Sequence, residues 1–190
     1  MSLARPLDLF RDRILDYGAT LARCKPRDLP PTIARALAGR GVGRLVVPCD
    51  LPHSWIEAVP QGKVEILEDG WGATGDRPLL SKHQLDAVDG ALTGCCVGIA
   101  ETGTIVLDGG PAQGRRVLTL LPDYHLCVVF GCQVVESVPE AVERLGEEVR
   151  VRRAPVTFIS GPSATSDIEL RRVEGVHGPR TLEVILVEEQ

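Results

Sequence analysis

This sequence of 190 residues has no long apolar run, few aromatic side chains and no excess of positive charge. No run of about 18 apolar residues occurs, which excludes a membrane-spanning helix. The opening MSLARPLDLFRDRI lacks the apolar stretch and the small-residue cleavage site of a signal peptide. The formal net charge of −5 argues against a broad nucleic-acid-binding surface. We therefore expect a cytoplasmic protein with no membrane span and no nucleic-acid partner.

Cysteine is present, but without the spacing that binds metals. The six cysteines are Cys24, Cys49, Cys95, Cys96, Cys127 and Cys132. Iron–sulfur clusters need runs such as C-x2-C-x2-C, which do not occur. Cys127 and Cys132 lack the second pair that a zinc site requires. We expect reduced thiols that pack as small hydrophobic side chains, with no metal and no cofactor held by this chain.

The composition is that of one globular domain that is rich in strands and turns. Because domains contain roughly 100–200 residues, we assign residues 1–190 to a single domain. Hydrophobic residues make up 44% of the chain and aromatic residues only 4%, so Val, Leu, Ile and Ala must form the core. The 20 glycines and 14 prolines favour many short strands joined by tight turns over a helical bundle.

Apolar residues recur at helical spacing in several segments. The first stripe consists of Leu7, Phe10, Ile14, Tyr17 and Leu21. We interpret residues 1–40 as an N-terminal helical segment that packs on the domain. Capping boxes, in which Ser is followed three residues later by Gln or Glu, begin two later helices at Ser81 and Ser137. The expected helices span residues 7–21, 32–38, 54–58, 82–92 and 138–149.

Short apolar segments between the helices predict strands. The expected strands span residues 44–47, 63–67, 95–100, 104–107, 117–121, 125–130, 156–159 and 182–187. Strand, helix and strand follow one another between residues 44 and 67, which predicts a parallel pair. The strands between residues 95 and 121 are joined by turns, which predicts antiparallel hairpins. The fold class is therefore α/β, with a mixed, mainly parallel sheet covered by helices.

Several familiar catalytic and nucleotide-binding motifs are absent. Gly39-x-Gly41-x-Gly43 follows a helix and precedes a strand, so it predicts a helix end rather than a dinucleotide site. No P-loop and no H-E-x-x-H motif occurs. The segment 161–165 resembles a nucleophile elbow but lacks its final glycine. Asp123-Tyr124-His125 is a weaker third candidate for chemistry, but it follows a proline, so a turn is sufficient to explain it.

One candidate for chemistry is the turn at residues 98–104, with the sequence GIAETGT. Glu101 lies between two apolar strands and is flanked by Thr102, Gly103 and Thr104. Backbone amides are available in such a turn, and a carboxylate there could act as a nucleophile or a general base. The alternative is that Glu101 only accepts hydrogen bonds from turn amides.

The other candidate is the polar segment after the strand at 156–159. Hydroxyls and glycines at the carboxyl end of a strand, followed by a helix at Asp167, are typical of an anion site. The residues proposed to bind an anion here are Gly161, Ser163, Thr165, Ser166 and Asp167. His177 and Arg180 lie in a further polar loop that could face the same cleft. The alternative is simple capping of a helix by Ser or Thr.

The two candidate segments also carry a family resemblance. CCVGIAETGTIVLDGGPAQGRRVLTLLPDYHLCVV, followed by PVTFISGPSATSDIELRRVEGVHGPRTLEVILV, strongly resembles the LUD-domain family, and within it the lactate utilization protein C branch. The resemblance is close between Leu92 and Val187. It implies a fold similar to the NagB/RpiA/CoA-transferase superfamily. It also implies a cytoplasmic role in oxidising L-lactate to pyruvate with iron–sulfur partner proteins, in which this chain is the member without a cluster.

Three functions remain open from the sequence. The first is a component of a lactate-oxidising complex without redox activity of its own. The second is an enzyme or binder of a small carboxylate, an acyl-CoA or a phosphorylated ligand. In that case Glu101-Thr102-Gly103 is similar to the Glu-x-Gly turn that supplies the nucleophile of CoA transferases. The third is a structural adapter subunit, which a large exposed apolar patch would favour.

Overall fold

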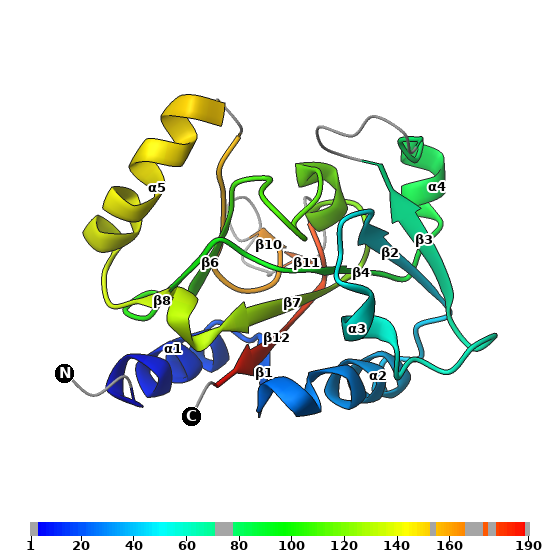
Figure 1. The fold of residues 1–190 in the computed structure, drawn as a ribbon, viewed down its shortest axis with the longest axis horizontal. Helices are drawn as coiled ribbons and strands as arrows, with labels where there is room; N and C mark the ends of the chain where they lie inside the picture. Colours follow the sequence, from blue (N-terminus) through cyan, green and yellow to red (C-terminus); the bar gives the residue numbers. More distant parts are fainter. Residues whose placement is uncertain (1–3, 71–77, 153–154, 166–172, 175–177, 189–190) are drawn as a thin grey trace.

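The computed structural model describes residues 4–70, 78–152, 155–165, 173–174 and 178–188. Its larger sheet has six strands in the order β1-β12-β7-β4-β2-β3 (Figure 1). These strands are β1 (Thr20–Cys24), β2 (Arg44–Pro48), β3 (Glu65–Asp69), β4 (Gly90–Thr93), β7 (Tyr124–Phe130) and β12 (Thr181–Val187). Every neighbouring pair in this sheet is parallel. The predicted α/β class with a mainly parallel sheet is therefore confirmed.

A second sheet has four strands in the order β8-β5-β6-β9. The strands are β5 (Val97–Ile99), β6 (Thr104–Leu107), β8 (Val134–Val135) and β9 (Thr157–Ile159). β6 is antiparallel to both β5 and β9, which confirms the predicted hairpin between the first two. A short antiparallel pair joins β10 (Ala164–Thr165) to β11 (Val173–Glu174).

Helices cover the sheets, and their apolar stripes decide which face each one takes. The helices are α1 (Ala4–Asp16), α2 (Leu29–Gly39), α3 (His53–Ile56), α4 (Lys82–Asp86) and α5 (Val138–Arg152). Three short 3₁₀ turns are η1 (Pro26–Asp28), η2 (Arg116–Thr119) and η3 (Gly131–Gln133). Neighbouring residues of β12 enter different clusters, since Val184 packs with α1 and Ile185 with α2. Because strand side chains alternate, α1 and α2 lie on opposite faces of the six-stranded sheet.

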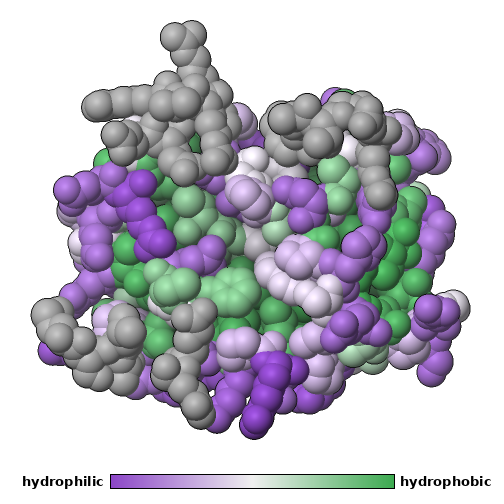
Figure 2. Space-filling model, viewed as in Figure 1, coloured by the Kyte–Doolittle hydropathy of each residue, from purple (hydrophilic) through white to green (hydrophobic). Residues whose placement is uncertain are grey.

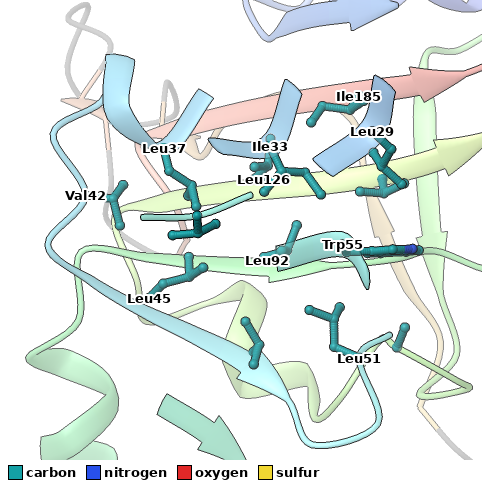
Figure 3. Packing of buried hydrophobic residues seen from close by; sticks show 14 of the residues in the cluster. Leu29, Ile33, Leu37, Val42, Leu45, Leu51, Trp55, Leu92, Leu126 and Ile185 are labelled. Carbon is teal, nitrogen blue, oxygen red and sulfur yellow. The ribbon is translucent and has the colours of Figure 1, made fainter. Parts of the chain in front are cut away.

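The larger core cluster lies between α2 and the six-stranded sheet (Figure 3). Leu29, Ile33 and Leu37 are spaced four residues apart on α2, so they form one stripe that faces the sheet. Trp55 of α3 and Leu126 of β7 complete the contact from two further elements. Truncation of a fully buried leucine in such a core costs about 2–5 kcal/mol of stability.

The second sheet packs on the α1 side of the six-stranded sheet. Ile105 and Leu107 of β6 join the cluster that contains α1. Val97, Ile99 and Val106 point the other way and pack against α5. α1 and β6 therefore share one layer, which brings the candidate turn at Glu101 close to the N-terminal helix.

In Figure 1 α5 stands at the outer left of the molecule, and Figure 2 shows hydrophilic side chains on that side.

Three sequence predictions of local structure are wrong. The helix expected over 7–21 ends at Asp16, because Gly18 adopts a φ of 79° and Leu21 belongs to β1. The helix begun by the confirmed capping box at Ser81 ends at Asp86, and Leu92 lies in β4. The expected strand at 117–121 is the 3₁₀ turn η2. In the first two errors an apolar residue of the following strand continues the helical stripe. The third arises because helical and strand periodicity cannot be separated in a short apolar run.

No helix within the described residues is long and apolar enough to cross a membrane.

Candidate functional site

Glu101 lies at the start of α5. Its Oε1 accepts a hydrogen bond of 2.7 Å from the amide of Val138, the first residue of that helix. Its own amide donates to the carbonyl oxygen of Glu136 at 3.1 Å. A carboxylate at a helix N-terminus satisfies an amide that has no partner within the helix and interacts favourably with the helix dipole. Glu101 is also solvent-exposed, so the carboxylate remains accessible.

A chain of hydroxyl groups joins the two candidate segments. Thr102 Oγ1 and Thr104 Oγ1 are 2.7 Å apart, and Thr104 Oγ1 lies 2.7 Å from Ser160 Oγ. Thr104 is only 4% exposed, whereas Ser160 is exposed. The pairing of β6 with β9 sets this arrangement, because it brings residue 104 next to residue 160. The structure thus unites the AETGT turn with the start of the segment at Gly161.

The glycines of both segments lie against the end of α1. Gly103 has a φ of 57°, and a Cβ there would approach the carbonyl carbon of Arg13 to 2.6 Å. Gly161 has a φ of 85°, and a Cβ there would approach the carbonyl oxygen of Tyr17 to 2.8 Å. Both positions therefore need glycine for backbone conformation and for the close approach of the N-terminal helix. Helix packing accounts for these two glycines without a ligand.

The remaining predicted anion-binding residues divide into two groups. Within the described residues, the Ser163 amide donates to the carbonyl oxygen of Pro179 at 2.9 Å. Arg180 Nε lies 3.5 Å from Asp123 Oδ1 at the exposed surface, and Thr165 pairs with Val173 through β10 and β11. Ser166, Asp167 and His177 lie outside the described residues, as does the predicted start of a helix at Asp167.

This polar region lies at a different edge of the fold from the one the sequence indicated. β9 belongs to the four-stranded sheet, not to the parallel sheet. The segment that follows it is bonded to Pro179, just before β12 begins, and Arg180 pairs with Asp123, just before β7 begins. The region therefore lies beside the amino ends of β7 and β12. Sequence periodicity identified the strand but carried no information about its sheet.

A second polar region, at residues 108–116, was missed. Here the chain folds over the carboxyl ends of three strands of the parallel sheet. Ala112 donates its amide to Asp50 Oδ2 at 3.0 Å, after β2, and accepts from the Gly94 amide at 2.7 Å, after β4. Arg115 binds Asp69, the last residue of β3, through Nε–Oδ2 at 2.7 Å and Nη2–Oδ1 at 2.6 Å. The run DGGPAQGRR was the available signal.

Nearly the whole chain is similar to proteins of one known family. A model of the LUD domain matches residues 7–187. The chain belongs to the LUD domain family. It is 48% identical over 187 residues to a protein of Deinococcus radiodurans called lactate utilization protein C, covering 98% of this chain and 82% of the relative. A protein of the same name from Geobacillus kaustophilus is 30% identical over 171 residues, which cover 84% of this chain and 69% of the relative.

The fold of this LUD domain is also found in a solved structure. The crystal structure of a DUF162 family protein from Deinococcus radiodurans has a TM-score of 0.79 and 43% identity, and the match covers 98% of this chain and 99% of that chain. The family resemblance drawn from the AETGT and GPSATSDIE motifs is therefore confirmed, and it extends over the N-terminal half as well.

One buried histidine of the LUD domain lies in the parallel sheet, near the amino end of β7. His125, which is 1% exposed on β7, shares a hydrogen bond of 2.8 Å between its Nε2 and Thr93 Oγ1 on β4. Its Nδ1 is buried and has no hydrogen-bond partner among the described residues. Burial lowers the pKa of His125 to about 4, so the ring is neutral near pH 7. The interpretation of Asp123-Tyr124-His125 as a turn is therefore wrong for its last two residues, which lie in β7, whereas the expected strand at 125–130 is confirmed.

The cysteines of the LUD domain differ in burial. Cys95 and Cys127 are buried, while Cys132 is exposed and the other three are intermediate. Contact with Cys127 and burial raise the pKa of the Cys95 thiol, which keeps it protonated and unreactive. Over the described ranges, no group of three or more His, Cys, Asp or Glu side chains is arranged to hold a metal ion.

Proposed function

We propose that this chain acts in lactate utilization, as the cluster-free component of a cytoplasmic system that oxidises L-lactate to pyruvate. The observation that carries the proposal is 48% identity over 98% of the chain to the lactate utilization protein C of Deinococcus radiodurans. At that level of identity over nearly full length, a shared role is the simplest expectation, although fold alone would not imply it.

The proposed division of labour follows from the chemistry of the reaction. Oxidation of lactate to pyruvate releases two electrons and two protons from the hydroxyl-bearing carbon and its oxygen. Iron–sulfur clusters accept electrons one at a time. The proposed partner proteins would supply these clusters. This chain would then contribute binding or positioning of the small carboxylate. The hydroxyls of Thr102 and Ser160, which the buried Thr104 links, and the exposed guanidinium of Arg180 are groups suited to that task.

A growth experiment tests this proposal. Deletion of the gene should abolish growth on L-lactate and leave growth on pyruvate unchanged, and the intact gene should restore growth. Normal growth of the deletion strain on L-lactate would exclude a role in lactate utilization. Purified chain that oxidised L-lactate alone with an artificial electron acceptor would exclude the role of a non-redox component.

A second candidate function uses Glu101 as nucleophile or general base in a transfer reaction like that of CoA transferases. The observation in its favour is that Glu101 is solvent-exposed in a Glu-Thr-Gly turn beside the hydroxyl chain. Glu101→Gln separates this role from capping of α5, because the amide oxygen of Gln still accepts the Val138 hydrogen bond but is a poor nucleophile. Loss of complementation with unchanged stability would favour catalysis. Full complementation would exclude it.

A further inference from the structure

The segment 108–116 occupies the point of the parallel sheet where the strand order reverses. From β2 the chain moves outward to β3, and it then crosses back to β4 and on toward β7. In open α/β sheets, ligands bind outside the carboxyl ends of the strands at such a point. The hydrogen bonds of Ala112 to Asp50 and Gly94 place this segment over the carboxyl ends of β2 and β4.

A small cavity lies between this segment and the second sheet. Its volume is about 40 Å³. The lining residues that carry polar side chains are Gln113, Arg115, Arg116, Thr119 and Thr157. A water molecule needs about 10–15 Å³ of such volume, so the cavity has room for a group of three or four non-hydrogen atoms. That is the size of the head of a small oxyanion.

The cavity lining offers hydrogen-bond donors and no carboxylate. The side-chain oxygen of Gln113 already accepts from the Asp108 amide at 2.7 Å, which leaves its amide nitrogen as a donor. Thr157 contributes a hydroxyl from β9. None of the nine residues that line the cavity is acidic. The polar side chains of this lining therefore suit a group that has only acceptor atoms.

The two adjacent arginines differ in how their charges are used. Asp69, which is 0% exposed, neutralises Arg115 through two hydrogen bonds. Arg116 is exposed, and no ion pair joins it to a carboxylate in the part of the chain that the structure describes. The positive charge of Arg116 at the cavity is therefore available for a ligand, and a guanidinium can bind an oxyanion through two parallel hydrogen bonds.

The segment is held in place before any ligand arrives. Arg115 is fixed by Asp69 and also donates to the carbonyl oxygen of Leu80 at 2.9 Å. Ala112 has a φ of 58°, a left-handed conformation that is unfavourable for alanine and that the bonds to Asp50 and Gly94 hold in place. A binding group on a fixed backbone loses less entropy when it binds than one on a free loop.

We infer that this cavity binds a small oxyanion, a carboxylate or a phosphate group, with Arg116 as the charge partner and Gln113 and Thr157 as further donors. The site is separate from the Glu101 region, because it lies at the Leu107–Thr157 end of the β6–β9 pair, whereas Thr104 and Ser160 lie at the other end. The inference does not depend on the lactate role.

Titration calorimetry on the full chain tests the inference, with pyruvate and inorganic phosphate as separate probes. We expect a dissociation constant in the millimolar range for at least one probe, weakened about tenfold or more by Arg116→Gln. Arg116→Lys, which keeps the charge but loses the paired donors, should fall between the two. The matched control is Arg35→Gln, which removes another exposed arginine, on α2, and should change the affinity less than about twofold.

Each outcome of the titrations either supports the inference or overturns it. Preference for pyruvate or for phosphate identifies which kind of oxyanion the site takes, and either result supports the inference. Equal weakening by Arg116→Gln and Arg35→Gln would mean a non-specific charge effect and would overturn it. So would the absence of binding by both probes at about 20 mM. The growth test on L-lactate is independent, so failure of one proposal leaves the other standing.

Discussion

The two glycine-rich polar regions of this LUD domain differ in what holds them. In the region of Thr104 and Ser160, Gly103 lies against the backbone of α1 and Gly161 against Tyr17, just after this helix, so the hydroxyl chain depends on helix packing. In the segment 108–116, a buried ion pair between Arg115 and Asp69 ties the backbone to the parallel sheet. Two segments of similar composition therefore have different physical roles. One allows a close contact with a helix, and the other forms a cationic loop that is fixed to the sheet.

Removal of the ion pair is expected to produce the largest effect. Arg115→Ala leaves the carboxylate of Asp69 buried without its cation, which should lower the free energy of unfolding by about 3–5 kcal/mol. Urea denaturation monitored by circular dichroism measures the change. Arg116→Ala, at the next position but exposed, should cost less than about 0.5 kcal/mol. Similar losses for both variants would contradict the conclusion that the Arg115–Asp69 ion pair, and not surface charge, stabilises this segment.

The next largest loss of stability is expected when the contact between Gly103 and α1 is disturbed. Gly103→Ala introduces a methyl group that must displace α1 and also forces alanine into a positive φ, with an expected loss of about 2–4 kcal/mol. Gly41→Ala is the matched control, because Gly41 has a φ of 65° but, within the part of the chain that the structure describes, no atom lies within 4 Å of the added Cβ. It should lose only about 1 kcal/mol, and the same denaturation assay compares the two. Equal losses would show that α1 does not constrain the Glu101 region.

The buried histidine on β7 predicts a dependence of stability on pH. The pKa of His125 is about 4 in the folded protein, below its ordinary value of 6.5, so the unfolded chain binds the proton more readily. The contribution of His125 to the free energy of unfolding is therefore fully present above pH 6.5 and is lost as the pH decreases toward 4. From pH 7.5 to pH 5 the loss should be about 2 kcal/mol. His125→Gln should remove this part of the pH dependence in urea titrations, and a slope identical to that of the wild type would refute the assignment.

The smallest expected effect concerns the cap of α5. Glu101→Ala removes the acceptor for the Val138 amide and should cost about 1 kcal/mol of stability, whereas Glu101→Gln should cost a few tenths. Thermal unfolding of both variants at the same pH checks the difference. If the Ala and Gln variants melt together, the hydrogen bond to Val138 contributes nothing measurable.

Much of the local structure was predictable because it depends on neighbours in the chain. The capping box at Ser81 forms as expected, with the Gln84 amide bonded to Ser81 Oγ at 3.3 Å. The apolar segments at β2, β6, β7 and β12 are strands, and Gly41 follows α2 in a positive-φ turn. β1 was missed because Leu21 happens to continue the helical stripe of α1, and only pairing with β12 makes it a strand.

The sequence by itself determined the α/β class, the strand and helix positions set by periodicity, and the family through its two motifs. Only the tertiary structure decided which sheet each strand joins, that α1 covers Gly103, and that Arg115 meets Asp69 across 46 residues of chain. The reason is physical. Periodicity and capping report hydrogen bonds and faces within a few residues, whereas a buried ion pair or a helix laid on a glycine exists only when distant segments are packed together.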